Sequence, residues 1–160
     1  MNKQNFKKLI SHLKKQQKSI EAARFNMRFF GVRIDGIMAE EKKNEILEMP
    51  VCNTQACLAG EATLSLKMGY ITKIGGISLY SKLRKKGLTI EDAAIKFLGL
   101  TVPESERLFY FRTMGVPGSL RTYGWPEQFE HRYHQATTPA DRLQVAIDRV
   151  EHFIKTNGEE

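Results

Sequence analysis

The segment PVCNTQACLAGEATLSLKMG, residues 50–69, decides the fold. The proline that opens it cannot continue a helix from upstream, because its ring removes a backbone N–H donor. Asn53 or Thr54 can accept hydrogen bonds from the free amides of a new helix, and Gly69 can end that helix in a left-handed conformation. Nine apolar or small residues between these ends leave the helix almost no polar face, and a helix that is apolar on all sides is buried. We therefore predict a buried central helix over about residues 54–68.

The rest of the chain carries further signals for helices. A threonine stands three residues before an acidic residue at Thr89, Thr101 and Thr138, and each pair predicts a helix that begins with a capping box. Pro126 predicts another helix, with proline at its first position. Residues 71–80 combine two glycines with β-branched residues, which indicates an irregular or short strand-like connection. We predict a mainly α protein, a single-domain irregular helical bundle around the central helix.

Length and composition fit one globular domain. A chain of 160 residues can bury a substantial core, and its 41% hydrophobic and 27% charged residues are ordinary proportions. No apolar run approaches the roughly 18 residues of a membrane span, and no apolar stretch of a secretory signal follows the charged N-terminus. The chain has two cysteines, which without a signal are expected to stay reduced. We expect a cytoplasmic protein without a membrane span or a cofactor.

Positive charge is concentrated at the N-terminus. Residues 1–30 contain eight lysines and arginines but a single acidic residue, Glu21, so this segment carries the whole net charge of +7. Apolar residues recur through it at helical spacing. We predict a basic amphipathic helix over residues 1–24, followed by a helical core domain over residues 25–158.

Three interpretations of this basic helix are open: a solvated face, a surface for nucleic acid or another acidic partner, or a helix on a membrane surface. A second basic cluster lies within residues 81–87. Lysine supplies charge without the bidentate base recognition of arginine, so nucleic-acid binding here is expected to have weak sequence preference. The predicted nucleic-acid-binding residues are Lys3, Lys7, Lys8, Lys14, Lys15, Lys18, Lys82, Arg84, Lys85 and Lys86.

The stretch CNTQACLAG at residues 52–60 resembles a C-G-T-x-x-C-x-A-G signature of small, largely uncharacterised bacterial and phage proteins. The expected helix over residues 137–154 is also similar to the C-terminal helix of that group. Asn53 stands where the signature has glycine, and Glu61 stands where histidine or tryptophan is expected. The resemblance implies a shared fold over roughly residues 25–155 and a bacterial or phage origin, and it implies no particular activity.

The two cysteines and one carboxylate of the central segment are the candidate catalytic residues: Cys52, Cys57 and Glu61. A thiol at the start of a helix feels the positive end of the helix dipole, which favours the nucleophilic thiolate. Catalysis would also need a base, and a histidine would have to come from another helix. The alternative is that both thiols pack in the core as small hydrophobic groups.

Glu61 needs a partner if the helix is buried. An unpaired carboxylate in the interior costs several kcal/mol. We expect Glu61 either to pair with an arginine, such as Arg107, Arg112 or Arg121, or to face a polar cleft.

Metal binding is the other chemistry that the cysteines suggest. Cys52 and Cys57 with His131 and His134 would form a zinc-like ligand set. The spacing of the cysteines departs from the usual C-x-x-C pattern, and the histidines lie in a charged segment. We predict no metal site.

The favoured function is that of a non-enzymatic binding protein with an acidic partner, with nucleic acid favoured over protein. The alternative is a small cysteine-dependent enzyme that uses Cys52 or Cys57 with Glu61 and a distal histidine.

Overall fold

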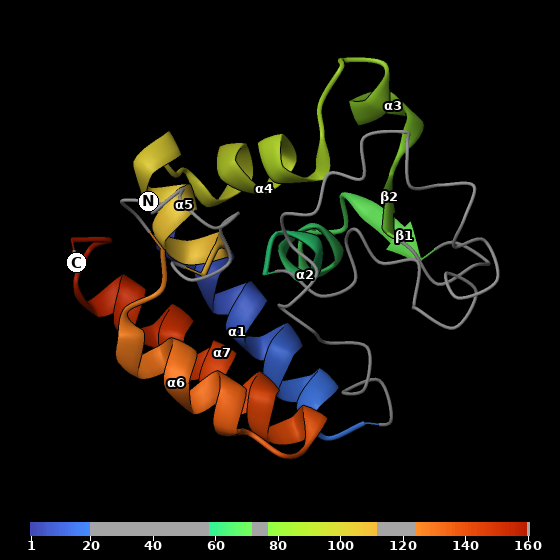
Figure 1. Cartoon of the computed structure of the whole chain (residues 1–160). Helices are drawn as coiled ribbons and strands as arrows, with labels where there is room; N and C mark the ends of the chain where they lie inside the picture. Colours follow the sequence, from blue (N-terminus) through green and yellow to red (C-terminus); the bar gives the residue numbers. More distant parts are fainter. Residues whose placement is uncertain (20–57, 72–76, 112–123, 160) are drawn as a thin grey trace, which may run out of the picture.

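The computed structural model describes residues 1–19, 58–71, 77–111 and 124–159, and these form a mainly α-helical domain (Figure 1), as predicted. Its helices and strands are α1 (Lys3–Gln17), α2 (Leu58–Ser65), β1 (Gly69–Ile71), β2 (Ile77–Leu79), α3 (Ser81–Arg84), α4 (Ile90–Leu98), α5 (Val102–Phe109), α6 (Glu127–Gln135) and α7 (Pro139–Lys155). Within these ranges, no helix is both long and apolar enough to cross a membrane.

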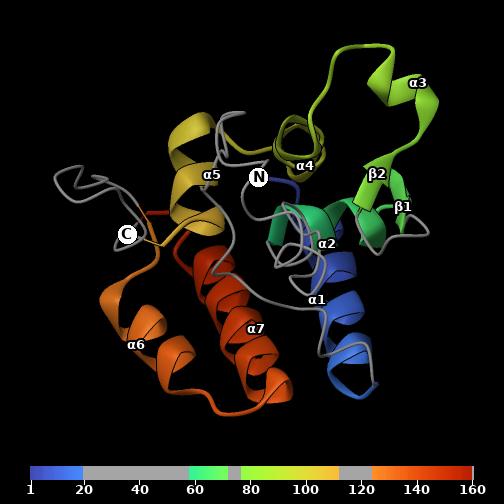
Figure 2. The same cartoon turned by 45° about the vertical axis from the view of Figure 1, so that its right-hand side comes forward.

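The N-terminal helix belongs to the hydrophobic core. Helix α1 lies beside α7 (Figures 1 and 2), and its Phe6, Leu9 and Leu13 are fully buried. The ring of Phe6 contacts that of Phe153 in α7, with the centroids 6.0 Å apart. The apolar stripe predicted from the helical spacing is therefore the face that docks on the rest of the domain, which leaves the lysines on the outer face.

The central helix is buried as predicted, but it ends earlier than Gly69. Every residue of α2 from Leu58 to Thr63 is buried. The helix ends at Ser65, and Lys67 adopts the left-handed conformation, with φ of 54°. The N–H of Met68 then donates to the carbonyl of Thr63 over 2.9 Å, which closes the last turn. The predicted start of this helix, at Asn53 or Thr54, lies outside the described residues.

Gly69 has a different role from the predicted helix cap. It begins β1, which pairs antiparallel with β2 so that Gly69 stands opposite Leu79. A Cβ atom at this position would lie 2.6 Å from the carbonyl oxygen of Ser78, closer than real Cβ atoms approach. Glycine is therefore required because two backbones meet there, a contact between segments that the local sequence does not reveal.

The predicted capping boxes are confirmed. Thr89, Thr101 and Thr138 each accept from the backbone three residues on, and the acidic residue there accepts from the threonine N–H. The hydrogen bonds from the side chain and backbone of Thr89 hold the pKa of the Asp92 carboxyl below its ordinary value. Pro126 is the residue before α6 rather than its first residue, and its carbonyl accepts from the first helical turn.

The close approach at Gly69 predicts the effect of adding a single methyl group. Gly69→Ala should lower the free energy of unfolding by about 1–3 kcal/mol, because the strands must move apart to admit the Cβ. Ser78→Ala, in the facing strand, is the control and should change stability by less than about 0.5 kcal/mol. Urea unfolding followed by circular dichroism measures both, and equal midpoints for the two variants would contradict the steric explanation.

Candidate nucleic-acid interface

The lysines of α1 and its C-terminal end differ in what lies beside them. All six of the lysines predicted between residues 3 and 18 are exposed. Lys7, Lys8 and Lys15 line a groove beside α2. Lys14 instead points to α7, where its Nζ lies 2.8 Å from a carboxylate oxygen of Glu151. Three of the six lysines therefore gather along one edge of α1, whereas Lys3 and Lys18 are exposed outside the groove.

This groove, which we call the basic groove, has a volume of about 570 Å³. It lies between α1 and the C-terminal end of α2, and Lys67 from the segment after α2 completes it. Hydroxyl and amide side chains lie among the lysines, and none of the lining residues that the structure describes is acidic. The lining residues are Gln4, Lys7, Lys8, Ser11, His12, Lys15, Leu64, Ser65 and Lys67.

The described residues that line the basic groove carry a net positive charge. Four lysines line it, whereas the C-terminal end of α2 contributes only about −0.5 of an elementary charge through the helix dipole. The turn after α2 weakens that contribution further, because the Lys67 N–H donates to the carbonyl of Leu64 over 3.1 Å. A groove lined by one sign of charge concentrates ligands of the opposite sign.

Glu61 lies fully buried behind the basic groove. His12 Nε2 is 2.8 Å from its Oε2, and the amide of Gln16 donates to its Oε1 over 3.2 Å. An ionised carboxylate can only accept hydrogen bonds, so in that state Nε2 carries the proton of the pair. His12 is partly exposed and also lines the basic groove. The pair thus connects the buried helix to the surface that a ligand would meet.

The described partners of Glu61 come from α1. Arg107 donates to the carbonyl of Gly158 instead, and Arg112 and Arg121 lie outside the described residues. Helix α1 was not named from the sequence as a source of partners, because it was predicted to be separate from the core. His12 falls one turn after Lys8 and one residue after Ser11. Its position beside the groove lysines could therefore have been predicted if α1 had been known to pack on α2.

The second predicted basic cluster lies at α3. Lys82, Arg84, Lys85 and Lys86 are all exposed, and no residue of α3 is buried. These four residues share no lining position with the basic groove. Both basic clusters named from the sequence are therefore exposed, while the contribution of Lys67 to the first carried no sequence signal.

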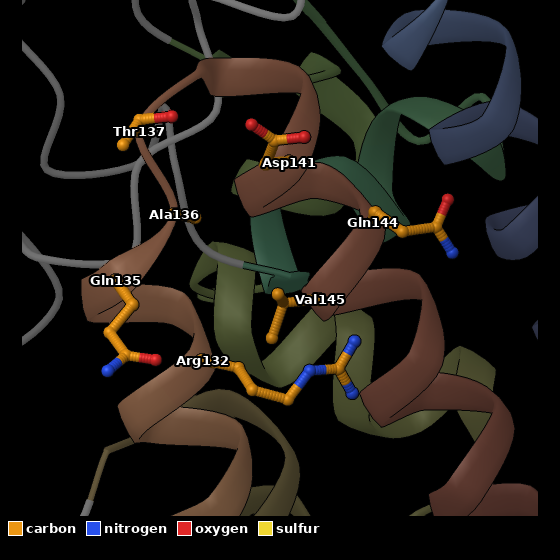
Figure 3. Close-up of a pocket in the computed structure, with 7 residues that line it drawn as sticks. All are labelled: Arg132, Gln135, Ala136, Thr137, Asp141, Gln144 and Val145. Atoms are coloured by element: carbon orange, nitrogen blue, oxygen red, sulfur yellow. The ribbon is translucent and has the colours of Figure 1, made fainter.

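A further pocket of about 370 Å³ lies where α6 meets the start of α7 (Figure 3). Figure 3 shows Arg132 reaching from α6 toward α7, where it forms an ion pair of 2.5 Å with Asp148. Asp141, on the opposite side, holds the capping box with Thr138. Because its charged groups already serve these structural contacts, this pocket offers little free charge to a ligand.

The structure leaves the role of the candidate catalytic cysteines as a prediction. Cys52 and Cys57 lie outside the described residues, whereas His131 and His134 occupy exposed positions of α6. Among the described residues, no cluster of three or more His, Cys, Asp or Glu side chains could hold a metal ion.

The hydrogen bond from His12 to Glu61 predicts a stability effect. His12→Ala should lower the free energy of unfolding by about 1.5–3 kcal/mol, because a buried carboxylate loses a donor. His131→Ala is the matched control: it makes the same change within a helix, so helix propensity cancels, and its exposed side chain predicts a change below about 0.5 kcal/mol. Urea midpoints measure both, and equal losses would show that the pair contributes nothing.

In comparisons with known proteins, no family model matches the chain, and neither a curated protein nor a solved structure shows significant similarity to it. The resemblance of residues 52–60 to the C-G-T-x-x-C-x-A-G signature stays a prediction. Function is therefore inferred from the chemistry of the basic groove and the surfaces around it.

Proposed function

We propose that the protein binds nucleic acid through the phosphate backbone, in the basic groove. The observation that carries this proposal is the set of four lysines, from α1 and from the segment after α2, that line one open groove with no acidic side chain among its described lining residues. Clustered lysines neutralise phosphates and release the counterions condensed on nucleic acid, which suffices for binding without sequence recognition. Ser11 and Ser65 add hydrogen-bond donors suited to phosphate oxygens.

The spacing of the lysines supports a regular polyanion over an acidic protein. Lys7 and Lys15 lie eight residues apart on α1, which corresponds to about 12 Å along the helix axis. One strand of a duplex presents roughly three phosphates over that length. An acidic protein surface is the second partner class, and its carboxylates would have to match the same spacing. Lysine gives charge without base readout, so weak sequence preference is expected.

A salt titration with matched variants tests this proposal. Lys7→Gln/Lys15→Gln removes two charges from the basic groove, and Lys3→Gln/Lys14→Gln removes two from the same helix outside it. The groove variant should weaken binding of labelled DNA and RNA. It should also make the negative slope of log K against log salt shallower by about 1.5, because two fewer phosphates are neutralised. The control variant, which has the same net charge, should change both quantities much less.

Two results would contradict the proposal. If the intact chain binds neither DNA nor RNA at low salt, the nucleic-acid function is wrong. If both double variants weaken binding equally, net charge rather than the basic groove accounts for the affinity, and an acidic protein becomes the better candidate partner.

The contact between Glu61 and His12 favours one second candidate, the cysteine-dependent enzyme. That alternative requires a histidine from another helix near Glu61, and His12 of α1 lies 2.8 Å from it. Cys57 directly precedes α2 in the sequence, four residues before Glu61. The candidate roles are a thiolate nucleophile from Cys52 or Cys57, and a base from His12 oriented by Glu61.

Thiol reactivity separates this second candidate from a purely binding protein. A catalytic cysteine should be alkylated by iodoacetamide near neutral pH in the folded protein, faster than free cysteine, because the thiolate is the reacting form. Cys52→Ser and Cys57→Ser identify which thiol reacts, and His12→Gln should slow the reaction. Alkylation only after unfolding in urea would contradict the enzyme interpretation, since buried structural cysteines are inert.

A further inference from the structure

Two tyrosines lie exposed on the β-hairpin. Tyr70 is 43% exposed and Tyr80 is 48% exposed, and their ring centroids are 5.5 Å apart with a tilt of 36°. Tyr70 pairs with Ser78 in the ladder, and Tyr80 follows Ser78 by two residues, so the two rings share one face of the hairpin. Ile77 and Leu79 point to the other face and are buried. The rings therefore form an aromatic surface that is open to solvent.

The backbone holds this tyrosine pair in place. The N–H of Tyr80 donates to the carbonyl of Met68 over 3.0 Å, which extends the pairing of the two strands. The carbonyl of Tyr80 accepts from the N–H groups of Leu83 and Arg84 and so fixes the start of α3. Beneath the hairpin, Leu79 packs in a small apolar cluster with Met68. A surface held in this way loses little conformational entropy when a flat ligand stacks on it.

Basic residues flank the tyrosine pair along the chain. Lys67, which lines the basic groove, precedes Tyr70 by three residues. The basic cluster of α3 begins two residues after Tyr80 and contributes Lys82, Arg84, Lys85 and Lys86. Figures 1 and 2 both show the hairpin between α2 and α3. The hairpin that carries the aromatic surface thus lies between two elements that bear basic residues, the segment after α2 and α3.

We propose that Tyr70 and Tyr80 form a stacking platform for the bases of single-stranded nucleic acid, whose phosphates bind the lysines and arginine on either side. This inference rests on the proposed nucleic-acid function and names the class of nucleic acid. Bases in a duplex are paired and stacked on one another, so they cannot lie on a protein ring, whereas unpaired bases of DNA or RNA can. Aromatic rings combined with a basic groove are the usual means of binding single strands without sequence preference.

The tyrosine pair also has a structural explanation, which the experiment must separate from binding. Neighbouring aromatic side chains across a pair of strands stabilise a hairpin. A purely structural pair would affect unfolding and leave the choice between ligands unchanged. Comparing ligands that carry the same charge but differ in their bases removes this ambiguity.

The test measures the affinity of the full chain for four ligands of equal length: an oligothymidylate, an oligouridylate, a duplex, and an abasic phosphodiester chain. The intact protein should bind the two base-containing single strands about tenfold more tightly than the abasic chain. Tyr70→Leu/Tyr80→Leu should abolish that difference and leave the affinity for the duplex unchanged. Tyr70→Phe/Tyr80→Phe keeps both rings and should retain it.

Phe97→Leu is the matched control, because Phe97 is an exposed aromatic residue on α4, outside both basic surfaces. It should bind all four ligands as the intact protein does. Urea midpoints of each variant show that the proteins are folded under the binding conditions.

The outcomes distinguish this inference from the function on which it rests. If the leucine variant keeps the preference for base-containing strands while Lys7→Gln/Lys15→Gln weakens binding, the stacking platform is wrong and the basic groove stands. If the intact protein binds the abasic chain as tightly as the oligonucleotides, only the phosphates are recognised and the platform is again wrong. If no ligand binds, the proposed function fails together with the platform.

Discussion

The arrangement of α1 depends on one constraint, the burial of Glu61 in an otherwise apolar helix. A carboxylate with no exposed surface needs hydrogen-bond donors, and among the described contacts α1 supplies two of them, from His12 and Gln16. These contacts, with the buried Phe6 and Leu9, fix the rotation of α1 about its axis. Once that rotation is set, the lysines at the edge of the buried face must lie beside α2, and the basic groove follows.

Helix α1 therefore supplies both part of the hydrophobic core and most of the positive charge of the basic groove. The apolar stripe of α1 belongs to one hydrophobic core with α2, α4 and α7, so the basic segment is built into the domain and does not hang from it as an arm. Removing the helix would remove three fully buried side chains along with the charge. Substitutions on its exposed edge change the charge alone, which is why they give the cleaner measurement of ligand binding.

Local patterns predicted the fold well, and contacts between distant segments explain what they missed. The threonines that cap α4, α5 and α7 were readable because the partner of each lies three residues away. Gly69 was misread as a helix cap because the reason for glycine there is the carbonyl of Ser78 on the facing strand. The contribution of Lys67 to the basic groove was not predicted either, because the other lysines of the groove come from α1, far away in the sequence. Exposed lysines were predicted from composition, but their division between the groove and the ion pair of Lys14 was not.

Gly69 also connects the two surfaces proposed to bind nucleic acid. The chain passes from Lys67 in the basic groove to Tyr70 on the hairpin within three residues, and the strand pairing that positions Tyr80 beside Tyr70 requires the close approach at Gly69. Charge in the groove acts over a Debye length of about 8 Å at physiological salt and weakens as salt rises. Stacking on the tyrosines acts only on contact and depends far less on salt. A single strand that passes from the groove to the hairpin would therefore be attracted by charge and retained by its bases, whereas a duplex could use only the first of these interactions.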